Sequence, residues 1–86
     1  MEQTVRLLFF GRLADIAGRR ERELPLAAPV SASALVETLR GEFPELAAAL
    51  IAPSVRIAVN RAITRDRDAR VEPGDEIAFL SPVSGG

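Results

Sequence analysis

The sequence contains no cysteine and no histidine. It therefore offers no disulfide, no thiolate nucleophile, no zinc-finger ligand set and no imidazole for acid–base catalysis. Lysine is also absent, so all 11 basic residues are arginines, and the formal net charge is -1. A balance this close to neutrality gives no general attraction to nucleic acid. These absences argue against a metal site, a self-contained catalyst and a nucleic-acid partner.

Long apolar runs and targeting features are missing as well. No stretch approaches the roughly 20 apolar residues that cross a bilayer. The start, Met1-Glu2-Gln3, has no basic region of the kind that opens a signal peptide. We therefore expect a cytoplasmic protein with no membrane partner. With 86 residues, 48% hydrophobic and 27% charged, the composition is typical of a single folded domain over 1–86.

Residue patterns predict a series of strands and helices. Strands are expected at 4–10, 20–26, 54–60, 62–64 and 76–81. Helices are expected at 12–17, 32–42 and 45–51. This order favours the α+β class: a mixed sheet with one main helix packed across one face. That is the ubiquitin-like β-grasp, in which the first and last strands are adjacent and parallel in the middle and the second strand lies at an edge.

Several local patterns give more specific expectations. Ser31 is expected to cap the main helix, and Leu13 and Ile16 fall on one face of the short first helix. The charged run 65–68 is interpreted as a solvated loop. The run 72–75 has Pro and Gly at the positions that a type II turn requires.

Strand alternation predicts which side chains face the main helix. In the first and last strands these are Val5, Leu7, Phe9, Ile77 and Phe79. The residues between them should point away, where a one-sided sheet would normally be polar. Instead, the outward positions include a candidate apolar docking patch made of Leu8, Phe10, Ile63 and Leu80. The alternative is that the 12–17 helix or a loop covers this face.

The sequence ends in Gly85-Gly86, a few residues after the last apolar strand. Glycines permit close backbone approach, and Pro82 biases Ser81 toward extended conformations. The six residues 81–86 can reach about 20 Å when extended. We interpret 81–86 as a flexible tail that enters a partner's active site, with the Gly86 carboxylate as the working group. The alternative is a frayed end or a cloning remnant.

Three stretches together resemble one known family. They are Leu8-Phe9-Phe10-Gly11-Arg12-Leu13-Ala14-Asp15-Ile16-Ala17-Gly18, Ala58-Val59-Asn60, and Pro73-Gly74-Asp75-Glu76-Ile77-Ala78-Phe79 followed by Ser81-Pro82-Val83-Ser84-Gly85-Gly86. The family is the MoaD family of sulfur carriers, the small subunit of molybdopterin synthase. The resemblance covers essentially the whole chain, and its C-terminal part is the most specific. Many relatives carry Pro where Ser81 stands.

The resemblance implies a reaction cycle. A MoeB-type enzyme uses ATP to adenylate the Gly86 carboxylate, and a sulfur donor protein then replaces AMP to give a thiocarboxylate. A MoaE-type large subunit takes up the tail residues Pro82, Val83, Ser84 and Gly85. Sulfur passes to cyclic pyranopterin monophosphate, and two transfers build the dithiolene of molybdopterin.

The resemblance also implies a division of labour between this chain and its partners. Phe10, Ile63 and Leu80 fall where the family docks through apolar contacts. The chain itself is expected to be a non-catalytic carrier subunit that binds no cofactor, because its acid–base groups would come from the partners.

Other functions use the same end group. Sulfur carriers also serve thiamine biosynthesis, cysteine biosynthesis and tRNA thiolation. Of these, the thiamine carriers are similar to a shorter chain that lacks the stretch Leu8–Gly18, so this sequence resembles them less. A ubiquitin-like modifier would instead join Gly86 to target lysines. A passive β-grasp interaction module, in which Gly-Gly is incidental, is the third possibility. Compositional bias explains the lack of lysine, which would also spare an activated carboxyl from the chain's own side-chain amines.

Overall fold

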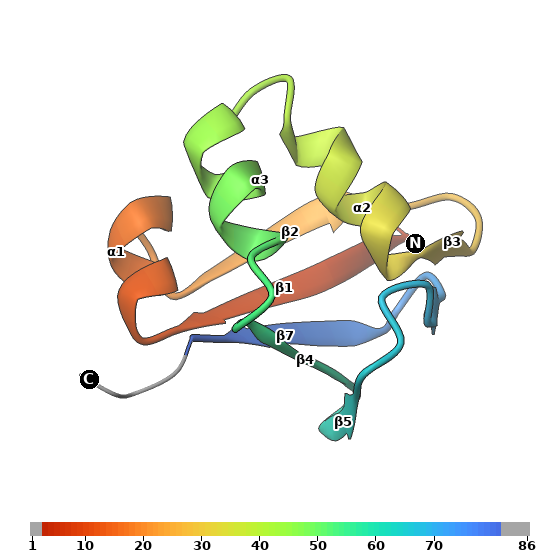
Figure 1. The fold of residues 1–86 in the computed structure, drawn as a ribbon. Coiled ribbons are helices and arrows are strands. Elements are labelled where there is room, and N and C mark those ends of the chain that lie inside the picture. The colour runs from red at the N-terminus through yellow and green to blue at the C-terminus, as the bar shows by residue number, and fades with distance from the viewer. Residues whose placement is uncertain (1–2, 82–86) are drawn as a thin grey trace.

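The computed structural model of the chain describes residues 3–81 (Figure 1). The elements in chain order are β1 (Thr4–Phe10), α1 (Arg12–Ala17), β2 (Glu21–Pro25), β3 (Val30–Ser31), α2 (Ala32–Leu39), α3 (Pro44–Leu50), β4 (Arg56–Val59), β5 (Ala62–Thr64), β6 (Arg70–Val71) and β7 (Glu76–Leu80). Every predicted strand and helix is present, with ends shifted by up to three residues.

One mixed sheet organises the fold. Its strand order is β2-β1-β7-β4-β5, with β1 and β7 parallel and the other neighbours antiparallel. The predicted mixed sheet, its parallel central pair and the edge position of β2 are therefore confirmed. The short strands β3 and β6 pair with each other in a separate two-stranded sheet, which the sequence analysis did not predict.

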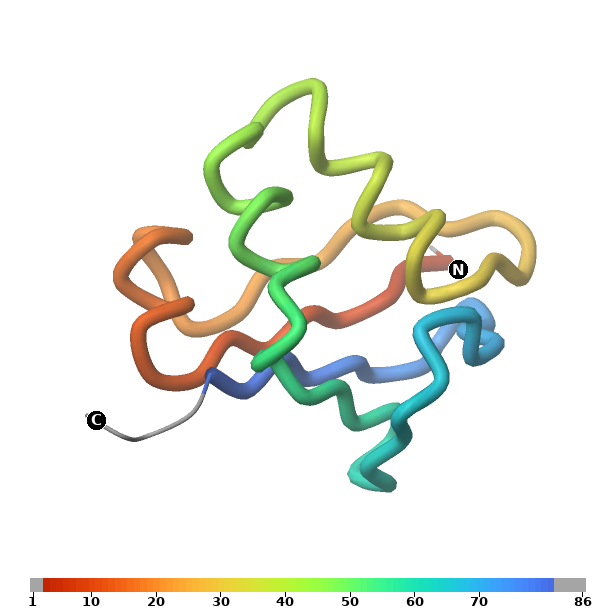
Figure 2. Tube along the Cα trace, in the orientation of Figure 1, coloured from red at the N-terminus to blue at the C-terminus, as the bar shows by residue number. Residues whose placement is uncertain are grey.

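The helices lie together on one side of the mixed sheet (Figures 1 and 2). Contacts join α1 to α3 and α3 to α2, and the side chains between this layer and the sheet form one buried cluster. The residues predicted to face the helices, Val5, Leu7, Phe9, Ile77 and Phe79, are all buried in it. Two of them, Phe9 and Phe79, stack with ring centroids 6.0 Å apart. Because α1 belongs to this layer, the idea that it covers the opposite face is wrong.

The main helix α2 begins as predicted and ends early. The Ser31 side chain caps it by accepting a hydrogen bond from the Ala34 N–H at 3.1 Å. It ends at Leu39 rather than at residue 42, because Gly41 disfavours a further helical turn. Pro44 then occupies the first turn of α3, where its missing N–H costs no hydrogen bond.

The short helix α1 has the predicted bounds but a different buried face. Gly18 ends it in the left-handed conformation, and its N–H bonds to the Ala14 carbonyl. Leu13 is buried, and Ala14 and Ala17 pack beside it. Ile16 is 43% exposed, so the prediction that it shares the buried face with Leu13 is wrong. With the face centred on Leu13, Ala14 and Ala17, Ile16 falls at its margin.

Two tight turns lead into β5 and β7, and the second has the predicted geometry. Asn60 and Arg61 both adopt positive φ between β4 and β5, as a two-residue hairpin turn requires. In the 72–75 turn, Gly74 has a φ of 93° and the Asp75 N–H bonds to the Glu72 carbonyl at 2.9 Å. This turn launches β7 beside β1, because the Gly74 N–H also bonds to the Thr4 carbonyl.

The charged loop 65–68 is not simply solvated, and that prediction is wrong for Arg67. Its guanidinium donates to the carbonyls of Leu50, Ala52 and Val55 at 3.1, 3.0 and 2.7 Å. Carbonyls after a helix end lack intrahelical partners, so one arginine satisfies three of them and holds the α3–β4 connection against the loop. Asp68 is also engaged, accepting a hydrogen bond from the Ser33 hydroxyl.

We predict that Arg67→Ala lowers the free energy of unfolding by about 2–3 kcal/mol, since it removes a charged donor and leaves partly buried carbonyls unpaired. Arg67→Lys should recover only part of this, because an ammonium cannot copy the planar fork. Arg65→Ala, two residues away and exposed, is the control and should change stability by at most about 0.5 kcal/mol. Equal effects at the two positions in urea unfolding would show that the three hydrogen bonds contribute nothing.

Candidate functional site

The face of the sheet away from the helices carries all four predicted docking residues. Register partners share a face, and the pairings of β1, β7, β4 and β5 bring six apolar residues onto it. We call them the open-face patch: Leu8, Phe10, Ala58, Ile63, Ala78 and Leu80. Phe10 pairs with Leu80 at the end of the sheet where the chain leaves β7. The structure therefore brings the predicted docking residues together, beside the root of the predicted tail.

The large side chains of the open-face patch are exposed or partly exposed, and the two alanines between them are buried. Phe10 and Ile63 are 47% and 67% exposed, and Leu8 and Leu80 are partly exposed. The two alanines between them, Ala58 and Ala78, are almost fully buried although they are on the open face. Contiguous apolar surface of this kind marks a docking site more often than isolated exposed residues do.

Charged side chains at one end of the open face neutralise one another. Arg6 bonds to Glu21 at 3.2 Å and approaches Glu76 to 3.9 Å, and Arg61, in the turn between β4 and β5, also approaches Glu76 to 3.9 Å. These pairs lie where β7 begins, away from the root of the tail. They bound the patch on that side, and being exposed they contribute little to stability.

Ser81 ties the root of the predicted tail to the corner between β1 and α1. Its hydroxyl oxygen accepts a hydrogen bond from the Arg12 N–H at 3.1 Å and donates to the Phe10 carbonyl at 3.3 Å. Gly11 lies between these partners with φ 65° and ψ -137°, a conformation that residues with a side chain rarely adopt. A Cβ on Gly11 would collide with the Ser81 oxygen. We call this contact of Ser81 with residues 10–12 the tail latch.

The tail latch was not predicted from the sequence, where Ser81 stood out as an extended residue before Pro82 and as a departure from the Pro of many relatives. A small polar residue after the last strand, with a glycine after the first, is the signal that could have indicated it. The remaining predicted site residues, Pro82, Val83, Ser84, Gly85 and Gly86, lie outside the described residues.

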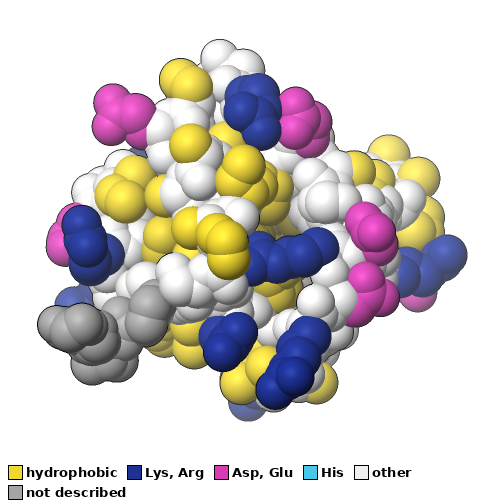
Figure 3. All heavy atoms as spheres, viewed as in Figure 1, with side chains coloured by type: hydrophobic (Ala, Val, Ile, Leu, Met, Phe, Trp, Pro, Cys, Tyr) yellow, Lys and Arg dark blue, Asp and Glu magenta, His cyan; other side chains and the backbone are white. Residues whose placement is uncertain are grey.

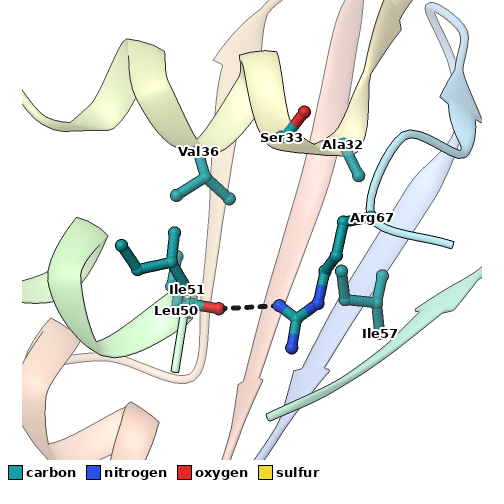
Figure 4. Close-up of a pocket in the computed structure, with 7 residues that line it drawn as sticks. All are labelled: Ala32, Ser33, Val36, Leu50, Ile51, Ile57 and Arg67. Atoms are coloured by element: carbon teal, nitrogen blue, oxygen red, sulfur yellow. Dashed lines mark hydrogen bonds between the residues drawn. The ribbon is translucent and has the colours of Figure 1, made fainter. Parts of the chain in front are cut away.

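A cavity of about 220 Å³ opens on the other side of the sheet, lined by Ala32, Ser33, Val36, Leu50, Ile51, Ile57 and Arg67 (Figure 4). Hydrophobic side chains gather on this face over α3 (Figure 3). The Arg67 fork reaches between α3 and β4, where backbone carbonyls already accept its hydrogen bonds. The cavity therefore has few polar groups left for a ligand, and we interpret it as structural.

Residues 3–81 hold neither a metal-binding cluster nor a membrane-spanning helix. No group of three or more Asp or Glu side chains there gathers closely enough to hold a metal ion. None of the helices in that range has the length and apolar character that a membrane crossing needs.

We predict that Gly11→Ala costs about 1–3 kcal/mol in unfolding free energy, because it strains the backbone and pushes against Ser81. Adding Ser81→Gly should recover part of the loss by removing the obstruction while the strain remains. Gly18→Ala is the matched control: its φ is also positive, but its Cβ would meet open space, so it should cost only about 1 kcal/mol. No recovery in the double variant would mean that the tail latch is not tight.

Comparison with known proteins finds relatives that match almost the whole chain. The family model described as the ThiS family matches residues 7–86. The molybdopterin synthase sulfur carrier subunit of Aedes aegypti is 38% identical over 88 residues, which cover 95% of this chain and 88% of the relative.

Two solved structures share the fold. The small archaeal modifier protein 1 (SAMP1) of Methanosarcina acetivorans superposes with a TM-score of 0.80 at 23% identity, covering 100% of this chain and 99% of that one. In the complex of subunits 1 and 2 of the molybdopterin-converting factor from Helicobacter pylori 26695, one chain matches with a TM-score of 0.66 at 22% identity, covering 96% and 99%. The predicted ubiquitin-like β-grasp is confirmed, and this chain belongs to the ThiS family, among its MoaD-type ubiquitin-like sulfur carriers.

Proposed function

We propose that this chain is the sulfur carrier subunit of a molybdopterin synthase. A MoeB-type enzyme adenylates the Gly86 carboxylate with ATP, and a sulfur donor protein supplies the sulfur that displaces AMP. The resulting Gly86 thiocarboxylate enters the active site of a MoaE-type large subunit. There it donates sulfur to cyclic pyranopterin monophosphate, in the biosynthesis of the molybdenum cofactor.

One observation carries the proposal: an uncovered apolar patch ends at the point where Ser81 leads into the tail. A partner that docks on Phe10 and Leu80 would have residues 82–86 at its own surface. Docking there would hold the reacting end near the partner's catalytic groups, and such positioning supplies much of the gain of a two-protein reaction. The name of the Aedes aegypti relative and the two-subunit Helicobacter pylori complex support this assignment.

In these reactions the only reacting group of the chain is its C-terminal carboxylate. In the first step the carboxylate attacks the α-phosphorus of ATP and pyrophosphate leaves. In the second, the outer sulfur of a persulfide on the donor protein adds to the activated carbonyl and AMP leaves; a thiol then cleaves the S–S bond, which releases the thiocarboxylate and leaves a disulfide. A chain without cysteine, histidine or lysine offers no side-chain thiol, imidazole or amine to intercept that carbonyl. The acid–base groups and the ATP site belong to the partners in this proposal.

We predict that the chain isolated from its native cell contains a fraction heavier by the difference between one sulfur and one oxygen atom, located at Gly86. A variant lacking Gly86 should carry no sulfur and should not rescue a strain deficient in molybdopterin. Gly86 found on target lysines would support a protein modifier instead. Sulfur on Gly86 without rescue by the intact chain would favour another sulfur pathway. Neither form, with an active deletion variant, would support a passive module.

We predict that Leu80→Glu keeps the fold but weakens binding to the large subunit at least 30-fold, because it buries a charge in the centre of an apolar contact. Leu80→Met should bind nearly normally. Ile51→Glu, at an exposed position on the helix side, is the control for a general effect of added charge. Circular dichroism would establish folding, and calorimetric titration the affinity. Full affinity of folded Leu80→Glu would rule out the open-face patch as the docking surface.

A further inference from the structure

The arginines fall into two groups according to their partners within residues 3–81. One group is engaged: Arg6, Arg22, Arg40, Arg61 and Arg70 form ion pairs, and Arg67 bonds to backbone carbonyls. The other group forms no ion pair with the carboxylates of these residues and is exposed throughout. It consists of Arg12, Arg19, Arg20, Arg56 and Arg65.

The sheet topology brings the second group to one end. β1 and β7 run parallel, so both end at the same edge of the sheet, and the antiparallel strands β2 and β4 begin there. Arg12 follows β1, and its own N–H belongs to the tail latch. Arg56 is the first residue of β4 and pairs with Leu80. Arg12 and Arg56 therefore flank the root of the tail, one on each side of β7.

The other three arginines extend this arrangement outward. Arg19 and Arg20 precede β2, and the Arg20 carbonyl accepts a hydrogen bond from the Phe9 N–H at 2.8 Å. Arg65 follows Thr64, the register partner of Ile57 beside Arg56. The two ends of the sheet thus differ in charge: the ion pairs of Arg6 and Arg61 lie where β7 begins, and the five arginines that form no ion pair within residues 3–81 lie where β7 ends.

We propose that Arg12, Arg19, Arg20, Arg56 and Arg65 form a cationic rim that docks onto a protein surface rich in Asp and Glu around the channel that receives the tail. This inference rests on the proposed function, because it assumes that a partner takes up residues 82–86. The rim adds what the apolar patch lacks, namely long-range attraction and a preferred orientation during encounter.

A protein carboxylate fits the rim better than a nucleotide phosphate at the reaction centre does. Gly86 lies five residues beyond Ser81, and five extended residues span up to roughly 16–18 Å. Groups that act on an extended tail would then be too far away for an arginine at its root. Carboxylates at the channel mouth are within reach, and a guanidinium binds them through two parallel hydrogen bonds.

The test is the rate of association between the intact chain and its cognate large subunit, at low and at physiological ionic strength. Arg12→Glu/Arg56→Glu should associate at least tenfold more slowly than the wild type at low salt, and the difference should shrink as salt is added. Arg19→Glu/Arg20→Glu alters only the turn before β2 and should also slow association. It serves as the test if Arg12→Glu/Arg56→Glu is poorly folded. Arg40→Glu/Arg70→Glu makes the same change in net charge away from the rim and should remain within twofold of the wild type.

The contrary results are equally specific. Rim variants that associate as fast as the wild type, or a control that slows equally, would overturn the rim. Binding of ATP to the isolated chain that both rim variants abolish would assign the arginines to a phosphate and would also overturn it. The proposed function fails separately: association that depends on the rim, by a chain that never carries sulfur, would refute the function and keep the rim.

Discussion

β1 and β7 lie side by side and parallel, with residues 6–10 paired to residues 76–80. A parallel pair cannot be joined by a hairpin, so everything between the two strands must cross from one end of the sheet to the other. Here the crossing chain places its helices on one side of the sheet (Figure 1). No element within residues 3–81 covers the opposite side, and the last strand lies inside the sheet rather than at its edge. The exposure of the open-face patch and the position of Ser81 beside it both follow from this pairing.

The same register separates two apolar functions within two short strands. Phe9 pairs with Phe79 on the helix side, where the two rings stack in the core, and Phe10 pairs with Leu80 on the open side. A slip of one residue would exchange these sets, because alternate side chains point to opposite faces. The stacked core pair and the turn that starts β7 therefore also keep Phe10 and Leu80 on the open side. Packing on the helix side thus decides which residues are exposed on the open side. The apolar residues of the open side would be removed from water only if a partner covered them.

Sequence patterns predicted what depends on near neighbours. The alternation in β1 and β7, the Ser31 cap and the Pro73-Gly74 turn are all decided within a few residues, and each was predicted correctly. Apart from the face of α1 and the end of α2, the misses involve partners far apart in the chain. Arg67 bonds to carbonyls 12 to 17 residues away, and Ser81 to groups about 70 residues away. No local pattern contains such pairs, and the pairing of β3 with β6 was missed for the same reason. The grouping of the five arginines that form no ion pair within residues 3–81 likewise appears only once the strand order is known.

The place of β7 between two neighbours has a mechanical consequence. A partner that draws residue 82 into a channel pulls along the axis of β7, whose hydrogen bonds to β1 and β4 run across that axis. The force then shears the hydrogen bonds of β7 to β1 and to β4 at the same time. An edge strand pulled sideways would instead lose its hydrogen bonds one after another. Ser81 adds its two hydrogen bonds at the point where the force enters. A domain built in this way resists unfolding from β7 when a partner pulls on its C-terminal end.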